Sequence, residues 1–92
     1  MFWENSDRIA ELRMKQDALN IEISQLLLQR LKLSLEIIQE KAKKGEGVKD
    51  PLRESEIITN ITEGKNLTET EKQFITEVFR TILDESCKIA SK

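Results

Sequence analysis

The sequence contains no histidine and no tyrosine, and its single cysteine is Cys87. Without histidine there can be no Ser-His-Asp triad and no Cys-His pair, and a zinc site loses its most usual ligands. The glycine-containing stretch KKGEGVK at 43–49 matches neither a phosphate-binding loop nor a dinucleotide fingerprint. An enzyme built from these residues is therefore expected to use charge and positioning, without a cofactor or a metal ion.

Other missing sequence features indicate where the protein is found and what it does not bind. No apolar run approaches the roughly 20 residues that a membrane span requires, and the N-terminal MFWENSDR lacks the basic start and apolar block of a signal peptide. The net charge is −2, with 15 basic and 17 acidic residues mixed along the chain, which argues against nucleic-acid binding. We therefore expect a cytoplasmic protein with no membrane or nucleic-acid partner. Its 92 residues allow one small domain, 1–92.

The stretch from about Asp7 to Lys44 contains no proline and no glycine, which predicts one long helix that Asn5 or Ser6 can cap. At the rise of an α-helix, its 38 residues extend roughly 57 Å, whereas a compact globule of this chain length has a radius of gyration of only about 12 Å. The helix therefore needs a second chain to cover its apolar side. Two rows at heptad spacing form that side: Leu12, Leu19, Leu26 and Leu33, and Ile9, Ile23 and Ile37.

Three basic residues lie on or beside this apolar seam. Arg30 falls in the isoleucine row, and Arg13 and Lys41 flank the same seam. A guanidinium on a buried row is costly unless it is paired, so a single arginine would be interpreted as a register-setting residue with a carboxylate partner. Three cations along one seam favour a site for a polyanion instead.

Two shorter helices are predicted after the turn at Gly45-Glu46-Gly47. The first begins at Asp50-Pro51, where Asp is a strong N-cap and Pro suits the first helical position, and ends at Gly64. The second opens with Thr68, which forms a capping box with the Glu three residues later. It places Ser86 on its apolar side, where the simplest interpretation is a hydroxyl bonded to a carbonyl one turn earlier. The expected fold is all-α, with three helices and a very long first helix.

These elements in order resemble the all-helical chorismate mutase family. They are Leu12-Arg13, Arg30, Lys41, the DPLRE stretch at 50–54 and Glu85-Ser86, and their spacing fits the family pattern without a gap as far as Glu54. No single element is specific, but their combination covers nearly the whole chain. The resemblance implies an intertwined homodimer of three-helix chains. It also implies an isomerase that converts chorismate to prephenate, on the shikimate pathway to the aromatic amino acids.

The resemblance also implies roles for individual residues. Lys41 would lie near a substrate carboxylate and the ether oxygen, and Glu54, helped by Asp50, would hold the ring hydroxyl. The implied catalytic residues are Lys41, Arg30 and Glu54. The implied substrate-binding set is Arg13, Arg30, Lys41, Asp50, Arg53, Glu54 and Ser86, with Arg13 reaching in from the partner chain.

Helix geometry independently allows this division of labour. Arg30 and Lys41 are 11 residues apart, which is close to three turns, so they share a face of the helix at roughly 16 Å. Arg13 precedes Arg30 by 17 residues, which places it about 25 Å away and rotated by roughly 100°. An antiparallel partner helix could bring Arg13 to the site formed by the other two.

One position departs from the family pattern. The family usually has Gln or Glu four residues after the helix 3 serine, as a second donor to the ether oxygen, and this sequence has Ala90 there. Lys41 then acts alone, or another group such as Lys88 or a water substitutes. Two alternatives therefore stay open: an isochorismate pyruvate lyase on the same scaffold, and a catalytically silent helical dimer that serves as an interaction or regulatory module.

Overall fold

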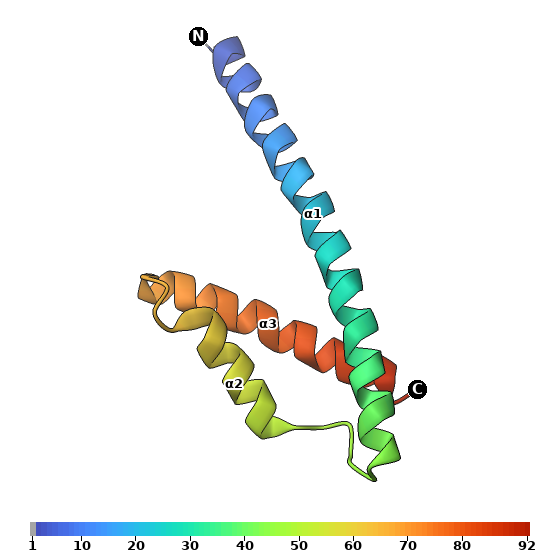
Figure 1. The fold of residues 1–92 in the computed structure, drawn as a ribbon. Coiled ribbons are helices and arrows are strands. Elements are labelled where there is room, and N and C mark those ends of the chain that lie inside the picture. The colour runs from blue at the N-terminus through green and yellow to red at the C-terminus, as the bar shows by residue number, and fades with distance from the viewer. Residues whose placement is uncertain (1) are drawn as a thin grey trace. The chain divides into compact units, whose positions relative to one another are not determined.

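The computed structural model of the protein describes residues 2–92 and contains three helices (Figure 1). They are α1 (Phe2–Lys43), α2 (Pro51–Thr62) and α3 (Glu69–Ala90). With 42 residues, α1 is longer than α2 and α3 combined, which have 12 and 22 residues. The predicted all-α fold with a very long first helix is confirmed.

The start of α1 differs from the prediction. The helix begins at Phe2, five residues before Asp7, so Asn5 and Ser6 lie inside it and neither caps it. The physical reason is the absence of any helix-breaking residue in this stretch. Once a helix is nucleated, each further residue adds one hydrogen bond at little cost, and nothing between Phe2 and Asp7 stops that propagation.

The end of α1 follows the prediction closely. Gly45 adopts a left-handed conformation with φ of 74°, which only glycine adopts without steric cost. The N–H of Gly45 donates to the carbonyl of Ala42 at 3.0 Å, and the N–H of Glu46 donates to the carbonyl of Lys41 at 2.9 Å. These two bonds form a Schellman motif, so the chain leaves the helix directly after the turn that carries Lys41.

The two shorter helices have the predicted caps. The Asp50 side chain accepts a hydrogen bond from the Arg53 N–H at 3.1 Å, which caps α2. At the start of α3 the Glu71 N–H donates to the Thr68 hydroxyl at 3.1 Å, and the Thr68 N–H donates to the Glu71 carboxylate at 2.9 Å. The carboxylate of Glu71 accepts from the Thr68 backbone N–H, and this bond, together with hydrogen bonding from the Thr68 side chain, lowers the pKa of Glu71. Local sequence signals therefore determine both starts.

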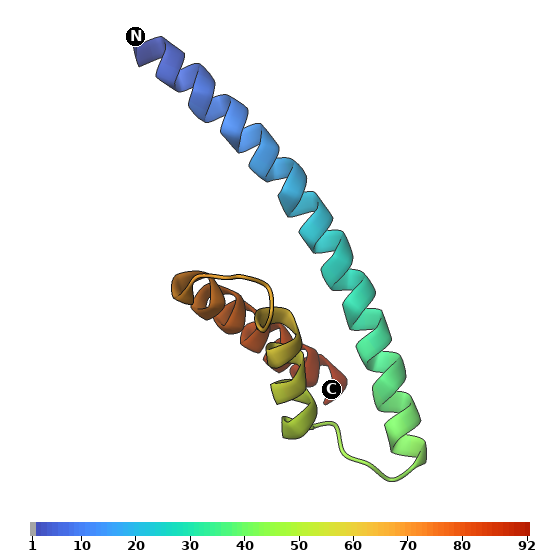
Figure 2. The same ribbon diagram turned by 60° about the vertical axis from the view of Figure 1, so that its left-hand side comes forward.

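The chain divides into two compact units, one up to Leu33 and one spanning Ser34–Lys92. In the second unit α2 packs against α3, and Figures 1 and 2 both show these helices side by side. Its core is small, because Leu83 and Thr62 are the residues classed as buried among those described. The Thr62 hydroxyl donates to the Ile58 carbonyl at 2.7 Å, so its burial leaves no unpaired donor. The expectation that residues 1–92 form a single domain stays a prediction.

The apolar rows of α1 are largely exposed in the single chain. The leucine and isoleucine residues that define the two heptad rows are between 46% and 62% exposed. Burying one such side chain is worth about 1.5–3 kcal/mol, and soluble monomers rarely leave so long an apolar stripe in contact with water. Covering these rows would therefore stabilise the helix more than the intrinsic helix propensity of its sequence does.

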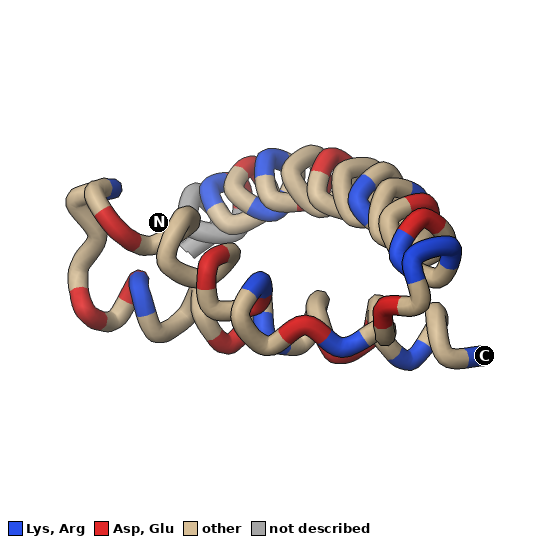
Figure 3. The backbone as a smooth tube through the Cα atoms, turned by 60° about the horizontal axis from the view of Figure 1, so that its bottom comes forward, with Lys and Arg blue, Asp and Glu red and all other residues tan. Residues whose placement is uncertain are grey.

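Charged residues of both signs are interspersed along the helices, as Figure 3 shows for the described part of the chain. Several form exposed pairs one turn apart, such as Arg8 with Glu11 at 3.3 Å and Lys43 with Glu40 at 3.0 Å. Pairs of this kind contribute little to stability because water screens them. Within residues 2–92, no helix is both long enough and apolar enough to cross a membrane.

Candidate active site

The predicted site residues fall into both units. Arg13 and Arg30 lie on the part of α1 that precedes Ser34. Of these, Arg30 is half-buried and Arg13 is exposed. The remaining predicted residues belong to the Ser34–Lys92 unit: Lys41, Asp50, Arg53, Glu54 and Ser86.

The ammonium of Lys41 lies beside the start of α2. Its Nζ is 3.9 Å from Oδ2 of Asp50, and only 19% of the Lys41 side chain is exposed, against 50% for Asp50. The other carboxylate oxygen of Asp50 caps α2, which ties its position to the helix backbone. Because an ammonium has three N–H donors, a single contact at this distance leaves Lys41 able to bind a further oxygen. The site therefore contains a half-buried cation with one carboxylate beside it.

Arg53 and Glu54 follow in the first turn of α2 and face different surroundings. The Arg53 side chain is 57% exposed and lies 3.8 Å from Glu56 on its own helix. Glu54 is 26% exposed, and its Oε2 lies 3.3 Å from Nζ of Lys49. Lys49 also lies 3.9 Å from Oδ1 of Asp84, on α3. Its hydrogen bond to Glu54 and the attraction of that charge raise the pKa of Lys49.

Ser86 is half-buried on α3, and its hydroxyl donates to the carbonyl of Ile82 at 2.8 Å. The simple interpretation of Ser86, a hydroxyl bonded one turn back, is confirmed, and its contact with a substrate carboxylate stays a prediction. Ala90 is half-buried one turn further along α3 and is the last helical residue. Lys88 is 68% exposed and donates to Glu85 at 3.0 Å. Residues two apart on a helix do not share a face, so Lys88 is poorly placed to replace a donor at position 90.

Arg13 lies among the apolar rows in the first part of α1. A shallow apolar groove along this stretch is lined by Ile9, Leu12, Arg13, Lys15, Gln16 and Leu19. An arginine in such surroundings can lay its aliphatic stem on the apolar row while its guanidinium reaches beyond it. A chain that covers this groove would therefore receive the guanidinium at its own surface.

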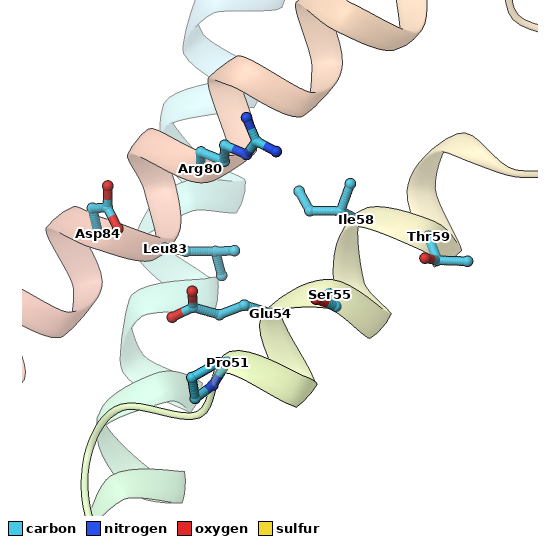
Figure 4. A pocket seen from close by; sticks show the side chains of 8 residues that line it. All are labelled: Pro51, Glu54, Ser55, Ile58, Thr59, Arg80, Leu83 and Asp84. Carbon is cyan, nitrogen blue, oxygen red and sulfur yellow. The ribbon is translucent and has the colours of Figure 1, made fainter.

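A separate cleft of about 520 Å³ opens between α2 and α3. Figure 4 shows the Glu54 side chain extending into it from α2, with Arg80 and Asp84 on α3. None of the other predicted site residues lines it, and the Arg80 guanidinium is paired with Glu77 at 3.1 Å. With two carboxylates and only one, already paired, guanidinium, this cleft is a poor match for a dianion. Its lining residues are Pro51, Glu54, Ser55, Ile58, Thr59, Arg80, Leu83 and Asp84.

Sequence reasoning did not identify Lys49, Arg80 or Asp84. A signal for Lys49 was present, because it directly precedes the Asp50-Pro51 cap and therefore must lie close to the first turn of α2. Arg80 and Asp84 carried no such local signal, since they look like ordinary surface residues of an amphipathic helix. Within the part of the chain that the structure describes, no group of acidic, cysteine or histidine side chains is arranged to hold a metal ion.

The structure defines a class of protein: an all-helical chain of three helices, in which the half-buried Lys41 lies beside Asp50. The family model of chorismate mutase type II matches residues 12–91, so the chain belongs to this family. The matched range includes every predicted site residue from Arg13 to Ser86. A search of curated protein sequences gave no significant match.

Proposed function

We propose that the protein is a chorismate mutase, a cofactor-free isomerase of aromatic amino acid biosynthesis that converts chorismate to prephenate. One observation carries this proposal. The family match spans the complete set of predicted site positions, and in that set the Lys41 ammonium is half-buried and held beside Asp50 at 3.9 Å. A fixed cation on a chain of this family is the feature that the reaction needs.

The reaction is a Claisen rearrangement within one molecule. The ether C–O bond breaks while a new C–C bond forms, and no proton, electron or leaving group is exchanged with the protein. Negative charge grows on the ether oxygen as its bond lengthens. A preorganised ammonium such as Lys41 therefore stabilises the transition state more than the ground state. The remaining side chains contribute by holding a compact conformer of the substrate.

The substrate carries two carboxylates and a ring hydroxyl, and the proposed contacts match them by charge. Arg30, Arg53 and the partner's Arg13 would bind the carboxylates or form the cationic surface around them. Glu54, with Asp50, would accept the hydrogen bond of the ring hydroxyl. Ser86 would turn its hydroxyl from the Ile82 carbonyl towards a carboxylate, a rotation that needs no backbone change.

We propose that the working form is an intertwined homodimer in the cytoplasm. The exposed heptad rows of α1 support pairing along this helix, because a second copy presents the same rows and would cover both sets at once. Arg13 lies within the groove that such pairing would cover. Each site would then be lined mainly by one chain and completed by Arg13 of the other.

The direct test is an assay of the purified protein at high concentration with chorismate. We expect chorismate to be depleted and prephenate to form faster than in buffer alone, with the oligomeric state measured on the same sample. An intact dimer with no turnover above the uncatalysed rate would contradict the proposal and favour the silent module. Release of pyruvate from isochorismate, with no prephenate formed from chorismate, would favour the lyase.

Replacing Ala90 by Gln is expected to raise kcat. The substitution restores a donor one turn after Ser86, at a half-buried position at the end of α3. Removal of one such preorganised donor typically lowers kcat by about 10²–10³-fold, so its restoration should recover a substantial part of that factor. The matched control is Ala90→Leu, which adds similar bulk without a donor. Equal rates for the two variants would show that the bound substrate does not reach position 90.

A further inference from the structure

A lysine outside the predicted site joins three segments of the Ser34–Lys92 unit. Lys49 belongs to the loop between α1 and α2, and its Nζ lies 3.3 Å from Oε2 of Glu54 on α2 and 3.9 Å from Oδ1 of Asp84 on α3. The two carboxylates therefore share one ammonium across the packed pair of helices. The arrangement holds Glu54 in a defined position relative to α3.

We propose that Lys49 is a positioning residue for Glu54, holding its carboxylate where it accepts the ring hydroxyl of the substrate. This inference rests on the proposed function, because the role of Glu54 belongs to that proposal. Glu54 has a long side chain with several rotamers, and it is only half-buried at the edge of the α2–α3 cleft (Figure 4). Without a partner, its carboxylate would be spread over several orientations, most of which cannot meet a bound hydroxyl.

The contact leaves Glu54 able to bind substrate. A carboxylate has two oxygens and about four acceptor positions, so a bond to one ammonium does not saturate it. The raised pKa of Lys49, caused first by its hydrogen bond to Glu54, shows that the pair favours the charged ammonium. Asp84 on α3 lies 3.9 Å from the same ammonium, so Lys49 has a carboxylate neighbour on each of the two helices.

The same pair is expected to contribute little to folding. The Lys49 side chain is 59% exposed, and ion pairs at such positions are weakened by water and by the entropy of long side chains. Loss of Lys49 should therefore leave the stability of the fold almost unchanged. An effect on catalysis would then come from the position of Glu54, not from a smaller folded fraction.

The test compares four forms with the wild type: Lys49→Ala, Lys49→Arg, Glu54→Gln and the double variant Lys49→Ala/Glu54→Gln. We expect Lys49→Ala to lower kcat/KM by about two- to fivefold, which is the bias that an exposed ion pair of this kind can give to the orientation of Glu54. Most of this change should be a rise in KM, because no bond to the ring hydroxyl changes in the reaction. Lys49→Arg should keep most of the activity. Lys43→Ala, which removes an exposed lysine paired with Glu40 at 3.0 Å, is the matched control and should behave as wild type.

The double variant decides whether Lys49 acts through Glu54. If it does, Lys49→Ala should have little further effect once Glu54 is Gln, so the two losses are far from additive. Additive losses, or an unchanged kcat/KM in Lys49→Ala while the wild type is active, would overturn the positioning role alone. A wild type that does not turn over chorismate would overturn the proposed function and this role with it.

Discussion

Replacing Lys41 by Ala is expected to lower kcat by at least the factor of about 10²–10³ that one preorganised group contributes to a developing oxyanion. Two observations make this the most damaging single change. The ammonium is half-buried and held beside Asp50, and Ala90 supplies no second donor on α3. The negative charge on the ether oxygen would then face no positioned cation. Single-turnover measurements at saturating chorismate would report the chemical step directly.

The control for this result is Lys43→Ala, in the same turn of α1. Lys43 is 71% exposed and paired with Glu40, so its removal should leave kcat within about twofold of the wild type, as for surface changes away from a site. Arg8→Ala, which removes another exposed pair, should behave in the same way. Equal rates for Lys41→Ala and either control would show that the catalytic site lies elsewhere. Circular dichroism on each variant would establish that α1 is intact.

Mixing two impaired variants is expected to restore activity if Arg13 acts across the dimer. Arg13→Ala and Glu54→Gln should each be severely impaired, because every site in either homodimer lacks one of the two groups. In a mixed dimer, one site combines the intact Glu54 of one chain with the intact Arg13 of the other. Random assembly makes half of the dimers mixed, so about a quarter of the wild-type activity should return.

The control for complementation is a mixture of Lys41→Ala and Glu54→Gln. Both residues belong to the same compact unit of one chain, so each site of a mixed dimer keeps one defect and no activity should return. Because the chains are expected to intertwine, both mixtures should be formed by coexpression or by refolding together. Absence of recovery in the Arg13 mixture, with mixed dimers present, would show that Arg13 serves its own chain or no site. Equal recovery in both mixtures would contradict the assignment of Lys41 and Glu54 to one site.

Several features of the fold could be predicted from the sequence because their causes are local. Asp50 and Pro51 mark the start of α2, and Thr68 with Glu71 marks the start of α3, each through hydrogen bonds within one turn. The left-handed Gly45 marks the end of α1 in the same way. The start of α1 was predicted too late because a cap residue such as Ser6 permits a helix to begin but does not prevent it from starting earlier.

The candidate site could be predicted from the sequence only in part. The sequence placed Lys41 and Glu54 on the right helices, and spacing within a helix follows from its fixed rise and twist. It did not show that Lys41 contacts Asp50, that Lys49 bridges Glu54 and Asp84, or that Arg80 lines a cleft with Glu54. These contacts join residues on different segments, and their distances depend on how the loop before α2 and the packing of α2 on α3 place each side chain.

The sequence by itself therefore determined the three helices, the long apolar seam and the order of the cations along it. Repeats, caps and breakers act over a few residues, and the physics of the helix extends them along the chain. Only the tertiary structure decided that Lys41 meets Asp50 and that Lys49 meets both Glu54 and Asp84. Such pairings depend on distances of a few ångströms between segments, and no spacing along the chain specifies those distances.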